Sequence, residues 1–335
     1  MDDVAHARAL CDQLGATFCL TYLKGVDAAE ALRRLGGYPD TIRERPGAEV
    51  TGQPRIAAAL ELGGWAVVIE PGGVLGADHA LLEAASRGSA AVSVLRHDAG
   101  AAHFGYVVDG VTITAFDPGY PAEETVWGED PGLLRHLLDA LELRPPSDES
   151  QRAWQDAEAR AIVLAQRITG VRVPDRPLRT ARLSGELEPW FVTPTSGADL
   201  LRAGRRTPYA AELLQAAEVA DPPVQRAVAL AEVRRQATVL GLADAPGLAE
   251  ALEAGGPVAV DSPLGRRVRD RLAAGPGTRP DPGLRWFLGA LRGVLGPDPR
   301  VALLAALKPY TSGLPGLADE RARAAALAAL REQGR

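Results

Sequence analysis

Hydrophobic and polar positions in the first third of the chain follow the period of β-strands. Residues 65–70 form an apolar run that is rich in β-branched side chains and ends at Pro71, which predicts a buried strand. Three later segments alternate between apolar and polar positions and predict further strands: 90–97, 103–108 and 111–116. Asp109 and Gly110, between the last two, are a strong signal for a two-residue hairpin turn.

The same pattern predicts a register for these strands. An Asp-Gly turn places Val108 opposite Val111, so Tyr106 faces Ile113 and Phe104 faces Ala115 on one face of the sheet. A pairing of His97 with His103 extends that face through the preceding strand. We therefore expect an antiparallel meander within residues 64–116, whose buried face contains Phe104, Tyr106, Val108, Val111 and Ile113.

Helical periodicity dominates the rest of the chain. Two short helices are expected at residues 3–17 and 26–36, the second capped by Asp27. Further helices are expected at 78–86, 130–143 and 151–169, the last ended by Gly170. From residue 209 onward the pattern is only helical, over 209–219, 223–240, 246–254, 263–273, 283–295, 298–307 and 318–332. Residues 38–54 and the proline-rich residues 171–197 are expected to be irregular.

Together these elements predict an α+β fold followed by helices. Residues 1–193 are expected to form a small antiparallel, hairpin-rich sheet flanked by helices, and residues 194–335 an all-helical domain. Two domains suit a chain of 335 residues, because domains typically contain about 150 residues. With 46% hydrophobic and 24% charged residues, the composition is that of a globular protein.

The charge pattern argues against a role in binding nucleic acid. The net charge is −6, whereas phosphate backbones select basic surfaces. Lys24 and Lys308 are the only lysines, so the other 35 of the 37 basic residues are arginine, a bias typical of GC-rich, actinobacterial coding sequences. The arginine groups of the helical half are interleaved with acidic residues and lack stacking aromatics, so solvated helix faces are favoured. They are Arg205, Arg206, Arg234, Arg235, Arg266, Arg267, Arg269 and Arg271.

A cytoplasmic location without a membrane span is expected. The N-terminus lacks the basic and apolar regions of a signal peptide, and no stretch of 18 apolar residues occurs. Cys11 and Cys19 both fall in the expected N-terminal helical region. On one continuous helix they would lie about 12 Å apart, too far for a disulfide, so buried free thiols in a reducing compartment are predicted.

Five stretches carry a family resemblance: Trp65–Pro71 with its two following glycines, the strand at 90–97, the hairpin at 103–110, Phe116-Asp117-Pro118 and residues 165–171. They resemble an uncharacterised actinobacterial family, a domain of unknown function. It covers about residues 15–193, and the later helices resemble an extension that some members carry. This chain has Gly72 where relatives usually have Asn, and Arg96-His97-Asp98 where they have aromatic residues. The resemblance implies kinship and no activity.

Polar side chains at the strand ends are the candidate catalytic residues: Glu70, His97, Asp98, His103 and Asp117. Two imidazoles and a carboxylate form a metal-compatible set, so His97 and His103 are candidate metal ligands. Glu70 and Asp117 could act as an acid–base pair if their environments differ. The same residues equally fit a solvated hairpin end and turn caps. We therefore favour the structural interpretation and expect neither a metal nor a cofactor.

Two other motifs also favour structural roles. The glycine-rich loop at residues 71–76 follows a strand and opens a helix, where phosphate can bind. However, Pro71 stands where the dinucleotide fingerprint has glycine, and no Gly-Lys-Ser/Thr follows, so a tight turn is favoured. Trp127, three residues before Asp130, is interpreted as a hydrophobic anchor ahead of a helix cap.

The leading functional hypothesis is a non-enzymatic protein-interaction module, immunity-like or regulatory, with a protein partner of unknown identity. It rests on the missing convergent catalytic motif and on the many amphipathic helices. The alternative is an enzyme with a site at the strand ends around Glu70, His97, His103 and Asp117, metal-assisted if the two histidines bind a metal. That alternative requires the four side chains to converge within about 12 Å.

Overall fold

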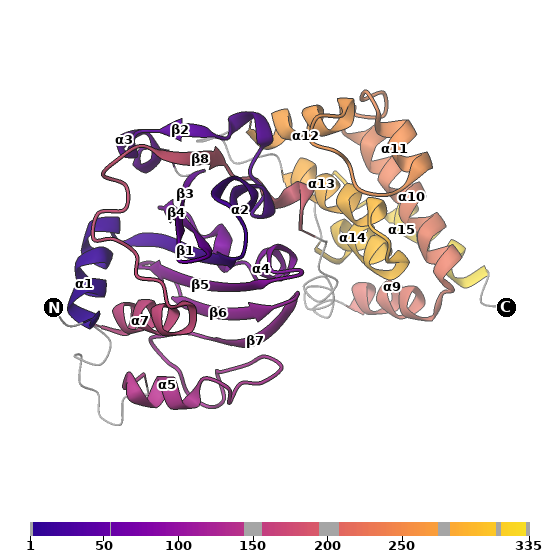
Figure 1. Cartoon of the computed structure of the whole chain (residues 1–335). Coiled ribbons are helices and arrows are strands. Elements are labelled where there is room, and N and C mark those ends of the chain that lie inside the picture. The colour runs from indigo at the N-terminus through magenta and orange to yellow at the C-terminus, as the bar shows by residue number, and fades with distance from the viewer. Residues whose placement is uncertain are drawn as a thin grey trace. The chain divides into compact units, whose positions relative to one another are not determined.

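The computed structural model describes residues 3–53, 55–143, 156–193, 208–273, 282–312 and 316–332. The chain divides into two compact units, Met1–Thr193 and Pro194–Arg335 (Figure 1). Residues 151–155 of the expected helix at 151–169, together with Arg205 and Arg206, lie outside the described residues.

The first unit is built on one antiparallel sheet flanked by helices, which confirms the α+β prediction (Figure 1). Its described strands run in the order β2-β8-β3-β4-β1-β5-β6-β7. Their bounds are Thr17–Lys24 for β1, Arg43–Arg45 for β2, Ile56–Leu62 for β3, Trp65–Pro71 for β4, Ala90–His97 for β5, His103–Val108 for β6, Val111–Phe116 for β7 and Arg182–Glu186 for β8.

The predicted meander is formed by β5, β6 and β7, whereas β4 does not pair with β5, because β1 lies between β4 and β5 and pairs with both. Residues 18–23 of β1 are buried on both faces, so the strand shows no alternation of apolar and polar positions. The N-terminal helix ends at Leu14 rather than at residue 17, and Cys19 lies in β1 rather than in a helix. Strands β2, β3 and β8 were also not predicted.

The registers of the hairpin strands are partly as predicted. Leu95, not His97, pairs with His103, a shift of two residues that leaves every side chain on its expected face. The turn at Asp109 and Gly110 has two positive φ angles, 48° and 79°, as a type I′ hairpin requires, and Val108 pairs with Val111.

A bulge between Tyr106 and Val107 then changes the pairing of β6 with β7. Tyr106 pairs with Thr114 and Phe104 with Phe116, where Ile113 and Ala115 were expected. A bulge adds one residue to one strand and therefore exchanges its two faces beyond that point. The expected buried face is thus wrong at this edge, since Val111 is exposed and Ile113 is only half-buried.

Helices cover both faces of the sheet. One face packs on α1 (Asp3–Leu14), α5 (Arg135–Ala140) and α7 (Ala157–Thr169), and its core includes Phe18, Tyr22, Ile69, Phe104 and Phe116. The other face packs on α2 (Ala28–Arg34) and α4 (His79–Ala85), and its core includes Leu23, Leu32, Val68, Leu81 and Leu82. As predicted, Asp27 caps α2 by accepting from the amide of Glu30, and Gly170 ends α7 with φ 72°.

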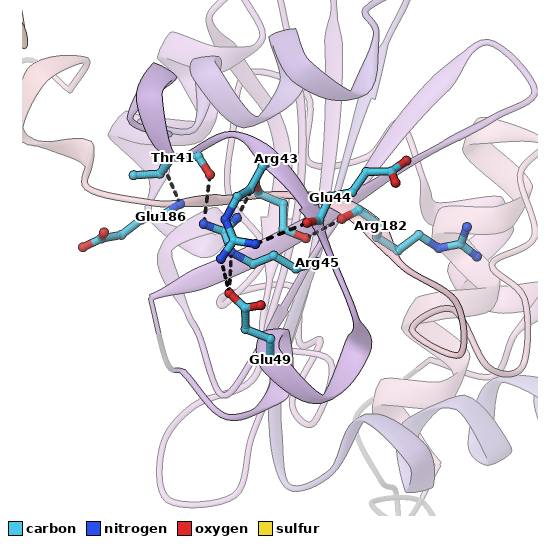
Figure 2. Close-up of polar contacts among 8 residues, drawn as sticks. Thr41, Arg43, Glu44, Arg45, Glu49, Arg182 and Glu186 are labelled. Carbon is cyan, nitrogen blue, oxygen red and sulfur yellow. Dashed lines mark hydrogen bonds and ion pairs between the residues drawn. The ribbon is translucent and has the colours of Figure 1, made fainter.

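A buried arginine fixes the outer edge of the sheet at β2. Arg45 donates to Glu49 in α3 (Gly47–Thr51), to the carbonyl of Ser184 in β8 and to the carbonyl of Thr41, over 3.0, 2.7 and 2.9 Å (Figure 2). Arg43 donates to the same Glu49 carboxylate. Strand β2 is short and highly charged, which is typical of edge strands that resist further pairing.

The second unit is helical throughout its described residues, as predicted. It contains α9 (Pro208–Val219), α10 (Pro222–Val239), α11 (Leu248–Ala254), α12 (Pro263–Ala273), α13 (Pro282–Leu295), α14 (Pro299–Ser312) and α15 (Glu320–Glu332). A buried carboxylate organises this core: Glu232 of α10 accepts from Arg235, Gln236 and Tyr310. In the part of the chain that the structure describes, no helix has the length and apolarity to cross a bilayer.

Candidate functional site

Glu70 lies near the end of β4, buried beneath the loop that follows the strand. Its two carboxylate oxygens accept hydrogen bonds from the amides of Leu75 and Gly76, over 3.0 and 2.8 Å. Burial raises the pKa of Glu70 to about 7, even though both hydrogen bonds favour the charged form. The carboxylate therefore titrates near neutrality while its oxygens are held by backbone.

The glycines of this loop are required by its closure over Glu70. A side chain at position 76 would overlap Thr21 Oγ1 and would place its Cβ 2.8 Å from Glu70 Oε1. A Cβ at Gly73 would lie 2.8 Å from Glu70 Oε2. The amides of Leu75 and Gly76, which could otherwise hold phosphate, are thus occupied by the protein's own carboxylate, which agrees with the tight-turn interpretation.

Cys19 completes a buried polar cluster beside Glu70. Its Sγ lies 3.4 Å from Ser93 Oγ and 3.7 Å from Thr21 Oγ1. Burial, together with the nearby Glu70 carboxylate, raises the pKa of the Cys19 thiol far above its usual range, and burial raises that of Cys11 to about 12. Both cysteines are free and buried, so neither is a ready nucleophile.

His97 and Asp98 order the turn between β5 and β6. The amide of Ala99 donates to His97 Nδ1 over 3.1 Å, and the Thr17 hydroxyl donates to Asp98 over 3.1 Å. Asp117 behaves similarly after β7, where it accepts from the amide of Gly119 over 2.8 Å. These three candidates are therefore engaged in local turns.

His103 belongs to an aromatic stack that was not predicted. Its ring lies 4.8 Å from that of His79, at the start of α4, and the His79 ring lies 4.4 Å from Trp127. Burial lowers the pKa of His103 to about 4 and also lowers that of His79. Both imidazoles are thus neutral at pH 7 and pack edge-on as aromatic rings.

The structure does not bring Glu70 and His103 together. They occupy the two ends of one row of paired residues, Glu70, Cys19, Leu95 and His103, across β4, β1, β5 and β6. Three strand spacings separate them, or about 14 Å between the backbones. Among the described residues, no three His, Cys, Asp or Glu side chains are grouped so that they could hold a metal ion.

Exposed aromatic and acidic side chains are concentrated in β7 and in the segment that follows it, residues 111–134. Val111, Tyr120, Trp127 and Leu133 are each between 42% and 47% exposed, although large apolar side chains are normally buried. Residues 111–134 contain five acidic residues and no basic one: Asp117, Glu123, Glu124, Glu129 and Asp130. All but the half-buried Asp117 are exposed. We call these nine residues the acidic–aromatic surface.

Backbone hydrogen bonds hold this surface against the sheet. Trp127 and Ala115 exchange two hydrogen bonds of 2.9 and 2.8 Å, and the amides of Glu129 and Asp130 donate to carbonyls of β7. Gly128, between them, has φ 135° and lies so close to Ile113 that a Cβ would overlap its carbonyl. Trp127 is therefore fixed on the edge strand, and His79 packs against its ring.

Sequence reasoning assigned Trp127 only the role of an anchor ahead of a helix cap. The sequence contains a stronger signal. Residues 111–134 include Tyr120 and Trp127 and have no basic side chain over 24 positions, although the chain has 37 basic residues. The position of Trp127 depends on its edge pairing with Ala115 of β7, which no local sequence pattern indicates.

Comparison with known families matches residues 2–187 to a family of unknown function, DUF6461. The matched segment covers more than half of the chain and ends near the close of the first unit. Searches of curated proteins and of solved structures gave no significant match. The strands at the edge of the sheet and the acidic–aromatic surface lie within the matched residues. The chain therefore belongs to the DUF6461 family.

Proposed function

We propose that this chain is a protein-interaction module whose acidic–aromatic surface binds a partner protein with a basic face. The observation that carries the proposal is that exposed Tyr120 and Trp127 lie among exposed carboxylates in one segment, which pairs with the edge strand β7 at Trp127. Exposed apolar groups rimmed by polar residues are typical of protein-binding surfaces. An immunity-like or regulatory protein acts by such binding, and we extend the proposal to that class and to a cytoplasmic location.

The energetics favour Trp127 as the centre of the interface. Tryptophan and tyrosine are enriched among the residues that dominate binding energy. Trp127 is held by two backbone hydrogen bonds and by the His79 ring, so little conformational entropy is lost when it is buried. Truncation of such a residue typically costs at least about 2 kcal/mol of binding free energy.

The charge of the surface selects the partner. Carboxylates attract a basic face and accelerate its association, an effect that salt screens. A symmetric dimer through the same surface would instead bring like charges together. The partner is therefore a different protein, rich in lysine or arginine.

The enzymatic alternative at the strand ends has weaker support. Glu70 is bound by loop amides, and His97 and Asp117 are engaged in turns. Each contact satisfies a polar group that catalysis would need to have available.

Photo-crosslinking in the native host tests the proposal. A crosslinking amino acid at Leu133, at the rim of the surface, should capture a basic protein, and the purified pair should bind with a salt-sensitive Kd. We expect Trp127→Ala to weaken that binding at least about 30-fold and the double variant E123K/E124K to slow association. The matched control removes exposed apolar side chains elsewhere, at Val219 and Val239, and should change neither quantity. An acidic partner, or equal binding by Trp127→Ala, would contradict the proposal.

A further inference from the structure

A cleft of about 840 Å³ opens beside the C-terminal end of β4. It is lined by the C-terminal half of α1, by α3, by the segment 175–179 and by Pro71. None of its residues belongs to the acidic–aromatic surface, so it is independent of the proposed function. The volume falls within the range of small-molecule sites, about 300–1,000 Å³.

The segment that carries one wall is tied to α1. It leads from α7 to β8 and passes α1 and α3 on the way (Figure 1). His6 of α1 lies 2.8 Å from the carbonyl of Val173 through Nε2, and its Nδ1 contacts the carboxylate of Asp175. Arg172 and Asp3 add an ion pair of 3.4 Å. The wall is thus fixed at its beginning.

The far end of the same wall is fixed by α3 and β8. Leu178 packs with buried Val50 and Ile56, and the Arg182 side chain donates to the carbonyl of Pro177 over 2.8 Å. Arg45 and Glu49 in turn join α3 to the sheet edge (Figure 2). The cleft is therefore preformed, and a ligand would not have to order its walls.

Two arginines give the cleft its chemical character. Arg176 and Arg179 occupy one turn, in which the amide of Arg179 donates to the Arg176 carbonyl over 3.2 Å. Both side chains are exposed, and neither guanidinium has an acidic partner among the described residues. The lining also holds two carboxylates, Asp12 and Asp175, and the Asp175 carboxylate lies against the His6 ring. The guanidiniums of Arg176 and Arg179 are therefore available to an anion that enters the cleft.

We propose that this cleft binds a small organic anion, whose phosphate or carboxylate group is held by Arg176 and Arg179. Guanidiniums favour such groups because their N–H donors match the geometry of phosphate and carboxylate oxygens. Ala9, Leu14, Pro71 and Leu178 line the cleft with apolar surface for the organic part of the ligand. Gln13 and Asp12, on α1, provide hydrogen-bonding groups for hydroxyls or amines.

Calorimetry with the full chain tests this site. The probes are adenosine 5′-monophosphate, glucose 6-phosphate, citrate and inorganic phosphate, each at low ionic strength. We expect at least one organic probe to bind with a Kd below about 1 mM. The double variant R176A/R179A should weaken that binding at least about tenfold. The control R234A/R266A removes two exposed arginines from helices of the second unit and should bind as the parent does.

A second variant separates binding from folding. Ala48 lies exposed on α3 and faces the cleft, so Ala48→Trp should fill the space and block the organic probes while the arginines remain. The proposal is overturned if no organic probe binds, or if R176A/R179A binds as tightly as the control. It is also overturned if inorganic phosphate binds as tightly as the organic probes, because the site would then hold an adventitious ion only.

Discussion

At the scale of single residues, Glu70 and Gly76 show how a loop that resembles a phosphate site serves the fold. The carboxylate takes the place of an external anion, and the glycine permits the approach. Sequence alone places a glycine-rich loop after a strand, but not the partner that its amides find. That partner is visible only once β1 brings Thr21 and Cys19 beneath the loop.

Gly76→Ala should destabilise the first unit by about 2–4 kcal/mol. The added methyl group overlaps Thr21 Oγ1 and crowds Glu70 in a fully packed core, where overpacking is costly. Gly72→Ala is the matched control in the same loop, since a Cβ there meets no atom within 4 Å and suffers only from φ 73°. It should cost about 1 kcal/mol. Urea unfolding measures both, and equal losses would refute the steric argument.

Glu70 also predicts a dependence of stability on pH. Its pKa is raised from 4.5 to about 7 in the folded protein, so between these values the folded state binds more protons than the unfolded state. The contribution of Glu70 is complete below about pH 4.5 and is lost as the pH rises through about 7. Relative to Glu70→Gln, the parent should lose up to about 3 kcal/mol between pH 5 and 8.

The free energies of unfolding of the parent and of Glu70→Gln, measured at several pH values, show whether the parent loses stability relative to the variant as the pH rises. The variant keeps one acceptor oxygen and cannot ionise, so it is the reference for every pH. Parallel curves would show that Glu70 does not titrate in this range, and a parent that gains stability relative to the variant as the pH rises would contradict the proposed burial effect.

At the scale of elements, the strands that the sequence predicts correctly are those whose signals lie within the strand and its adjoining turn. Strands β5, β6 and β7 were predicted within their bounds because alternation and an Asp-Gly turn define them. Strands β1 and β3 were missed because β1 is buried on both faces and β3 on five consecutive positions, which hides the alternation. No local sequence pattern indicates the bulge between Tyr106 and Val107, so the predicted pairing of β6 with β7 is correct only on the turn side of the bulge.

Gly128→Ala should release residues 127–130 from β7. The new Cβ overlaps the Ile113 carbonyl, and φ 135° is unfavourable for alanine. The freed edge would present unpaired backbone groups, which promote association between sheets. We expect increased self-association by light scattering and weaker partner binding. Gly132→Ala is the control, because its Cβ makes only an ordinary contact of 3.5 Å with Asp130. A monodisperse Gly128→Ala protein would contradict this role for the segment.

At the scale of the whole molecule, the candidate sites arise from contacts between distant segments. The cleft needs His6 beside Asp175, and the acidic–aromatic surface needs Trp127 beside Ala115. Neither pair shares a local motif, so composition could mark the acidic stretch but not the place where it lies. The two units, in contrast, each have a core of their own, one built on the sheet and one on helices around Glu232.

Separate cores predict two unfolding transitions, each sensitive to its own variants. Gly76→Ala should lower the transition of the first unit alone. Glu232→Ala leaves Gln236, Tyr310 and Arg235 without their shared acceptor and should lower the other transition, by about 3 kcal/mol or more. Calorimetry of the full chain and of a fragment containing residues 1–193 measures both, and the fragment should reproduce the first transition. If either variant shifts the two transitions equally, the two units unfold as one cooperative structure, and the prediction of independent unfolding is wrong.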